Sequence, residues 1–207
     1  EQACAGGLFF CTRRCPHTEV AQSKEEDDVL VLTAEGVAHI MTGSAAGESG
    51  NLSVGEVLER DHHRIDGYFE TFAQSLSGEG PIDAEAFSTG AAGLRHHIYV
   101  EEVLHFPAMK AGGLMGPVFV MLRQHGELRD RIAEIATKLE SGASAAEIVP
   151  VWKALEDGLE AHNDKEEKIL YPAGDDLLTD DLGEEILERL ANPDIPEGWT
   201  CEMSGRS

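Results

Sequence analysis

The sequence is short of basic residues and contains no long apolar run. Its 207 residues include 16 Lys and Arg against 39 Asp and Glu, which gives a formal net charge of −23 at pH 7. Nucleic acids and anionic membrane surfaces repel such a chain, so we expect neither as a partner. No stretch reaches eighteen consecutive apolar residues, and no membrane-spanning helix is therefore predicted.

Motifs of several enzyme classes are also missing. The sequence has no Ser/His/Asp set, no phosphate-binding glycine loop and no Walker pattern, so neither a hydrolase triad nor a nucleotide site is predicted. A hydrophobic content of 42% with 27% charged residues is nevertheless typical of a soluble globular protein. We therefore expect one domain with a sizeable core and a short appendage.

Cysteines are few and lie near the two ends, at Cys4, Cys11, Cys15 and Cys201. The even number is compatible with disulfides, and the thiols near the N-terminus are also compatible with a metal site or with free thiols. His17 adds a potential ligand there, but the spacing matches no strong zinc pattern. The segment ACAGGLFFC lacks a basic flank and is a poor signal peptide. Because the chain begins at Glu1 rather than at methionine, we expect a processed or truncated product. The location that we expect is the cytoplasm of a bacterium.

Composition and turn signals divide the chain into three parts. Residues 1–51 predict a cysteine-containing appendage that ends in the small-residue linker TGSAAGESGN. Residues 52–175 carry helical periodicity, and residues 176–207 predict a short helix and a tail.

Helix signals recur through the second part. Capping boxes occur at SVGE, residues 53–56, and at SAAE, residues 144–147. Amphipathic stripes with short turns predict four long helices and a shorter fifth, which begin near residues 53, 83, 117, 144 and 179. The fold class expected is all-α: an up-down-up-down antiparallel four-helix bundle with a short C-terminal helix and an irregular N-terminal appendage.

Two stretches of this region share one pattern. HIYVEEVLHFPAM, residues 97–109, and HNDKEEKILYPAG, residues 162–174, both read His, three residues, Glu-Glu, three residues, aromatic, Pro-Ala. Residues four apart on a helix share a face, so each copy presents one histidine and its first glutamate together. The repetition indicates two helices with the same chemical task.

The predicted core stripes bring polar residues to one level. The histidines of the first and third helices lie about ten residues from the end of the bundle at which the second and fourth helices finish. In an antiparallel bundle these positions form one layer, and the two glutamates lie one turn nearer that end. The predicted cluster comprises His62, His97, Glu101, His125, His162 and Glu166.

A metal centre explains this cluster best. A single histidine on an apolar face is usually a packed core residue, but an unpaired buried carboxylate costs several kcal/mol. Two divalent ions bring four positive charges against the two glutamates, and a bridging hydroxide or oxide balances more. Imidazole and carboxylate ligands together suit iron, manganese or zinc.

Neighbouring residues compete for these roles. Helical phase places His63 and His96 off the apolar stripes, so we prefer the adjacent histidine in each pair. Asp66 lies one turn after the first histidine and is a candidate extra ligand or hydrogen-bond acceptor. Glu102 and Glu167 are expected to point outward or to support the ligands.

Four segments in order resemble the motifs of the hemerythrin-like His-His-Glu cation-binding family: DHHRID, HHIYVEEVLHFP, VFVMLRQHGELR and HNDKEEKILYP. The resemblance covers residues 53–175. It implies a four-helix bundle with an oxygen-bridged non-haem di-iron site whose ligands are the six residues named above.

One position departs from the oxygen-carrying members of that family, which have a further histidine one turn after the histidine of the third helix. Here it is Arg129. We expect a more open coordination sphere that binds or reduces O2, peroxide or NO in a stress-response or sensing role. The alternatives are a di-iron enzyme (a peroxidase, an oxidase or an iron–sulfur cluster repair protein) and, less favoured, iron storage or delivery. A metal-free interaction bundle is the remaining hypothesis.

Overall fold

A computed structural model describes residues 52–203 of the chain, and the expected appendage with its three cysteines lies outside these residues. Every regular element from residue 52 to residue 203 is a helix, which confirms the all-α prediction. The elements in chain order are α1 Val54–Ser77, α2 Ala84–Val100, η1 Glu101–His105, α3 Phe106–Ala111, α4 Met115–Glu140, α5 Ala145–Lys165, η2 Glu166–Leu170, α6 Tyr171–Asp175 and α7 Asp180–Ala191.

Helices α1 and α5 begin at the two capping boxes that the sequence predicts, whereas α4 begins at Met115, two residues before its predicted start. The Ser53 hydroxyl accepts from the amide of Glu56 at 3.2 Å, and the Glu56 carboxylate accepts from the amide of Ser53 at 2.8 Å. At the start of α5, the Glu147 carboxylate accepts from the amide of Ser144 at 2.9 Å. Such reciprocal bonds satisfy amides that a helix leaves without intrahelical partners.

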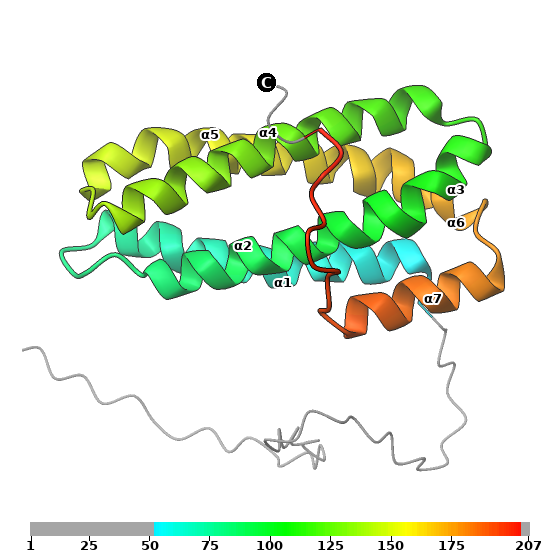
Figure 1. Ribbon diagram of the computed structural model, residues 1–207, viewed down its shortest axis with the longest axis horizontal. Helices are drawn as coiled ribbons and strands as arrows, with labels where there is room; N and C mark the ends of the chain where they lie inside the picture. Colours follow the sequence, from blue (N-terminus) through cyan, green and yellow to red (C-terminus); the bar gives the residue numbers. More distant parts are fainter. Residues whose placement is uncertain (1–51, 204–207) are drawn as a thin grey trace, which may run out of the picture. The chain divides into compact units, whose positions relative to one another are not determined.

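Helices α1, α2, α4 and α5 lie side by side, and α7 packs on α1 and α2 near one end (Figure 1). Gly113, with φ of 97°, and Gly142, with φ of 73°, occupy the turns that precede α4 and α5. Only glycine adopts such angles without a steric cost, so these turns can be short. The largest core cluster contains several aromatic residues, with Phe72 edge-on to Trp152 at a centroid distance of 5.1 Å.

Two π-helical turns interrupt the second and fourth helices of the bundle. In η1 the amide of Phe106 donates to the carbonyl of Glu101, and in η2 the amide of Tyr171 donates to the carbonyl of Glu166. These are i to i−5 bonds, which accommodate one more residue than an α-turn. One aromatic residue follows each turn, and after it comes the proline of the repeated pattern, which has no amide hydrogen to donate.

Beyond the π-turns, the buried positions differ from those that the sequence predicts. Regular helical periodicity places Leu104 and Ile169 on the core face, but Ile169 is 58% exposed and Leu104 is only partly buried. The next residues in the chain, His105 and Leu170, are 0% and 2% exposed instead. The extra residue in each turn rotates the helix beyond it by about 100°, and this rotation moves the core position by one.

The segment after α7 crosses the bundle towards α4 (Figure 1). The Arg95 guanidinium donates to the carbonyl of Trp199 at 2.9 Å. A Cβ atom at position 126 would lie 2.7 Å from the carbonyl oxygen of Met203, so the close approach of this segment to α4 requires Gly126.

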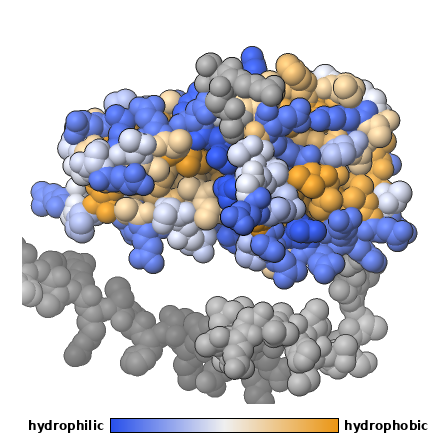
Figure 2. All heavy atoms as spheres, viewed as in Figure 1, coloured by the Kyte–Doolittle hydropathy of each residue, from blue (hydrophilic) through white to orange (hydrophobic). Residues whose placement is uncertain are grey.

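The face drawn in Figure 2 is largely hydrophilic, with hydrophobic residues gathered at the end where α3 leads into α4. Exposed side chains in this part of the chain include Val103, Met115 and Phe119. Within residues 52–203 no helix is both long enough and apolar enough to cross a membrane.

Candidate metal centre

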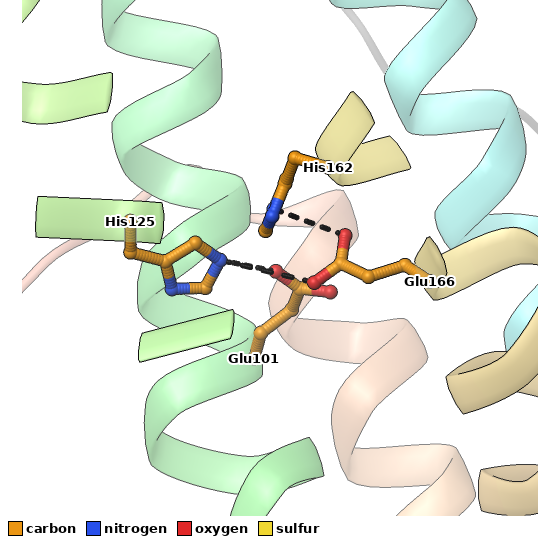
Figure 3. A group of neighbouring side chains, drawn as sticks. All are labelled: Glu101, His125, His162 and Glu166. Carbon is orange, nitrogen blue, oxygen red and sulfur yellow. Dashed lines mark ion pairs between the residues drawn. The ribbon is translucent and has the colours of Figure 1, made fainter. Parts of the chain in front are cut away.

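The six predicted side chains converge in the bundle core, where each is at most 2% exposed. Two overlapping groups offer ligand atoms within 4.8 Å of one another, and Glu166 belongs to both. The first group is Glu101, His125, His162 and Glu166 (Figure 3), and the second is His62, His97 and Glu166.

The histidines form two pairs with the glutamates between them. The ring centroids of His62 and His97 are 4.5 Å apart, and those of His125 and His162 are 4.8 Å apart. Glu101 spans the pairs, because its Oε1 lies 3.5 Å from His97 Nε2 and its Oε2 lies 3.3 Å from His125 Nε2.

Glu166 also contacts histidines of both pairs. Its Oε2 lies 3.5 Å from His62 Nε2 and 3.2 Å from His162 Nε2, while its Oε1 lies 3.8 Å from His125 Nε2. Four Nε2 atoms and two carboxylates thus lie around one small space.

Carboxylates outside this space orient three of the imidazoles. The Nδ1 atom of His62 lies 2.9 Å from Glu167 Oε1, and that of His97 lies 3.0 Å from Asp61 Oδ2. A carboxylate accepts hydrogen bonds, so Nδ1 carries a hydrogen in each ring and Nε2 faces the centre. This arrangement is typical of metal-binding histidines.

The third oriented imidazole is tied to the C-terminal segment. The Nδ1 atom of His125 lies 2.9 Å from Glu102 Oε1. The Cys201 thiol donates to the same carboxylate at 2.9 Å, and so does the amide of Glu202 at 2.9 Å. Burial raises the pKa of Glu102, but His125 and the donors of the C-terminal segment lower it by a larger amount. The net pKa is below its ordinary value, so the carboxylate stays ionised.

The structure leaves central atoms without hydrogen-bond partners, although they are buried. These atoms are Glu101 Oε2, His125 Nε2, both ring nitrogens of His162, and Glu166 Oε1. Buried polar atoms without partners are costly, and these are carboxylate oxygens and imidazole nitrogens, which are the atom types that bind metal ions. The donor set therefore fits one or two cations of the iron, manganese or zinc type.

Electrostatics at the centre follow from burial and proximity. Burial lowers the pKa of His97, but Glu101 and Asp61 raise it by a larger amount, so that the pKa is about 10. For His125, burial lowers the pKa while Glu101 and Glu102 raise it to about 9. Without a cation these two imidazoles hold protons that a metal ion would displace.

The pKa values of Glu166 and His162 are shifted downwards. Burial and the nearby Glu101 raise the pKa of Glu166, but His162 and His62 lower it to about 2. Burial lowers the pKa of His162, so this imidazole is neutral. A neutral imidazole beside an ionised carboxylate is already in the protonation state that metal binding requires.

Tyr171 is a central residue that the sequence reasoning missed. Its hydroxyl lies 2.9 Å from Glu101 Oε1 and 3.3 Å from Glu166 Oε2. The same oxygen lies 3.1 Å from His62 Nε2 and 3.2 Å from His97 Nε2. Burial raises the phenol pKa well above its ordinary value, and the two carboxylates raise it further. The aromatic position of the repeated pattern is the available signal, but the proline beside it favours a helix end rather than a ligand.

His105 is a second missed residue. It is fully buried and neither of its ring nitrogens has a hydrogen-bond partner. A Cβ atom at position 174 would lie 2.6 Å from His105 Nε2, so Gly174 makes room for the ring. Its inward position depends on the π-turn, which sequence periodicity does not reveal.

The competing histidines lie elsewhere. The His63 side chain is 69% exposed and approaches Glu59 at 3.9 Å. His96 is buried, but it packs near Tyr99, with ring centroids 6.5 Å apart, and it belongs to neither ligand group.

Two further sequence candidates also lie outside the groups. Asp66 lines a groove of about 600 Å³ between α1 and α5, together with Glu167. Arg129 is half-buried, and its Nη1 is buried without a hydrogen-bond partner among residues 52–203.

Comparisons with known proteins agree with this geometry. The family described as Hemerythrin HHE cation binding domain matches residues 53–174. Uncharacterized proteins of Mycobacterium tuberculosis and Mycobacterium bovis are each 29% identical over 141 residues, which cover 66% of this chain and 81% of theirs.

A solved structure has a similar fold. It is a Hemerythrin HHE cation binding domain-containing protein from Mycobacterium kansasii, with a TM-score of 0.55 and 23% identity over 69% of this chain and 88% of that one. The family match extends over more than half of the sequence and includes all six converging residues. The chain therefore belongs to the Hemerythrin HHE cation binding domain family.

Proposed function

We propose that the protein holds two iron ions and binds or reduces O2, peroxide or NO in a stress-response or sensing role. The observation that carries the proposal is the pair of overlapping ligand groups that share Glu166. One ion would be held by His62 and His97 and the other by His125 and His162. Glu101 and Glu166 would lie between the two.

The choice of iron rests on the resemblance to hemerythrin-like di-iron proteins, and the ligand chemistry is compatible with it. Mixed imidazole and carboxylate ligands suit iron, manganese and zinc, and the family is described as cation-binding. Bound iron would supply one-electron and oxygen chemistry that no side chain in this core can supply. Manganese and zinc are the alternatives.

Burial of the centre favours a small ligand. All six side chains are at most 2% exposed, so a large substrate has no access without movement of the helices. The groove between α1 and α5 is lined by Glu167, whose carboxylate contacts His62. A diatomic molecule or peroxide is the size that such a buried centre admits.

The number of histidines favours reaction over reversible carriage. The centre has four histidines, and Arg129 stands where the oxygen-carrying members of the family have a fifth. A missing ligand leaves an exchangeable position at which an oxidant can bind directly. A role for Arg129 as a cation beside the centre would require its guanidinium to turn inward.

Rapid mixing of reduced, iron-loaded protein with each ligand tests this function. We expect fast oxidation by O2, slow consumption of hydrogen peroxide, and no spectrum that argon flushing reverses. The matched variant Arg129→His should shift the behaviour towards reversible binding if the missing ligand is the cause. An O2 adduct of the wild type that argon reverses would show a carrier, and no response to O2, peroxide or NO would contradict the proposal.

A further inference from the structure

The Tyr171 hydroxyl occupies the space between the ligand groups. It lies 2.9–3.3 Å from four ligand-type atoms, two imidazole nitrogens and two carboxylate oxygens. The side chain is 2% exposed and its ring lies 5.7 Å from that of His62. No other hydroxyl has such contacts among residues 52–203.

Counting hydrogens shows what this hydroxyl faces. His62 uses Nδ1–H towards a carboxylate, so its Nε2 atom presents a lone pair to the phenol. His97 makes the same contact through Nδ1, and its Nε2 atom presents a lone pair once a metal ion has displaced the second proton of the ring. Glu101 and Glu166 present lone pairs as well. A phenol has one hydrogen, so it can satisfy only one of four neighbours. A cation bound next to the phenol oxygen would accept lone pairs from this oxygen and from the neighbours that the phenol hydrogen leaves without a partner.

We propose that Tyr171 is an oxygen ligand of the ion held by His62 and His97. The inference rests on the proposed function, since it adds a ligand to the same centre. Coordination replaces the phenol hydrogen by the metal ion, and the proton leaves to solvent. Tyrosine is a known protein ligand of iron.

The repeated pattern makes the two ions unequal. Phe106 occupies in the first copy the place that Tyr171 occupies in the second. Phe106 stacks on His125 with an interplanar angle of 13° and a centroid distance of 5.4 Å. It has no oxygen to offer, so only the ion of His62 and His97 gains a phenol ligand. The exchangeable position therefore lies at the ion of His125 and His162.

The test uses the visible colour that a phenolate gives when it binds ferric iron. The protein is loaded with ferrous iron and oxidised with ferricyanide, which accepts one electron per iron. We expect a visible charge-transfer band, with tyrosine ring vibrations enhanced in its resonance Raman spectrum. Tyr171→Phe should abolish both signals and retain most of the iron.

The chain offers a matched control. Tyr99 is also buried, but it packs against Trp199 at a centroid distance of 5.2 Å and away from the ligand groups. Tyr99→Phe should therefore keep the band. A ferric protein with two irons and no phenolate band would overturn this inference alone, as would a band that persists in Tyr171→Phe. A protein that takes up no iron would overturn the proposed function and the inference with it.

Discussion

The two glutamates of each Glu-Glu pair contact different atoms of the histidines. Glu101 faces Nε2 of His125 at 3.3 Å, whereas Glu102 contacts Nδ1 of the same ring at 2.9 Å. Successive residues on a helix are about 100° apart, so one pair can hold the inner and the outer edge of an imidazole on a neighbouring helix. The same division recurs at the second pair, where Glu166 and Glu167 contact His62.

Adjacent histidines provide the sharpest test of individual ligands. His62→Ala should lower the iron content, because the replaced side chain is 2% exposed and its Nε2 faces the centre. His63→Ala is the control, since its side chain is 69% exposed on the same helix. Elemental analysis of both variants gives the answer, and equal iron losses would contradict the assignment.

The outer carboxylates can be tested in the same way. Glu102→Gln should weaken iron binding by roughly 10- to 100-fold, because supporting partners of metal-binding histidines have effects of about that size. Competition with a chelator of known affinity measures the change. The control is Glu59→Gln, which alters an exposed carboxylate that pairs with His63 at 3.9 Å. If Glu102→Gln bound iron like the control, Glu102 would have no supporting role.

At the scale of elements, the π-turns place residues that periodicity misplaces. Helix starts, the six converging residues and the all-α class follow from local capping and 3.6-residue stripes, which the sequence displays directly. Periodicity misplaces Ile169 and misses His105, because a π-turn adds a residue without a sequence signature. Asp61 and Cys201 act through contacts between distant parts of the chain, and one sequence carries no local signal for these.

A deletion tests whether η1 contains an inserted residue. Removing Val103, which is 41% exposed, should convert η1 to an α-turn and preserve the packing of α2 and α3. Iron binding should fall, because Glu101 lies in η1 and changes position relative to the histidines. Removing Ala133 from the regular helix α4 should instead displace the fully buried Ile135 and cost about 2–5 kcal/mol of unfolding free energy.

Thermal denaturation followed by circular dichroism separates these outcomes. The variant without Val103 should retain most of the wild-type thermal midpoint, and the variant without Ala133 should not. Equal destabilisation by the two deletions would show that η1 does not contain an inserted residue that can be removed without disturbing the flanking helices.

At the scale of the whole molecule, protons and metal compete for the core. The pKa of His97 is raised from 6.5 to about 10 and that of His125 to about 9. Because these pKa values are higher in the folded state than in the unfolded state, protonation of the two imidazoles stabilises the metal-free fold. The stabilisation is at its maximum below pH 6.5 and is lost as the pH rises through about 9 to 10. Metal ions need neutral imidazoles, so metal affinity changes in the opposite direction.

Stabilisation by a redox-inert ion should therefore increase with pH. We expect the rise in thermal midpoint on adding Zn²⁺ to be larger at about pH 8.5 than at about pH 6, because fewer protons must be displaced at the higher pH. The same scans in the presence of EDTA provide the baseline at each pH. A rise that is equal at both pH values, or larger at the lower one, would contradict the assigned protonation.

The central claim is that one buried cluster of four histidines and two glutamates holds two metal ions. The most direct measurement is the iron content of protein purified from iron-replete cells, by elemental analysis against a protein concentration from amino-acid analysis. The two overlapping ligand groups predict about two irons per chain, with a large loss in Glu166→Ala, which removes the shared ligand. A wild-type protein that contains no metal and has the same thermal midpoint before and after iron loading would contradict the account.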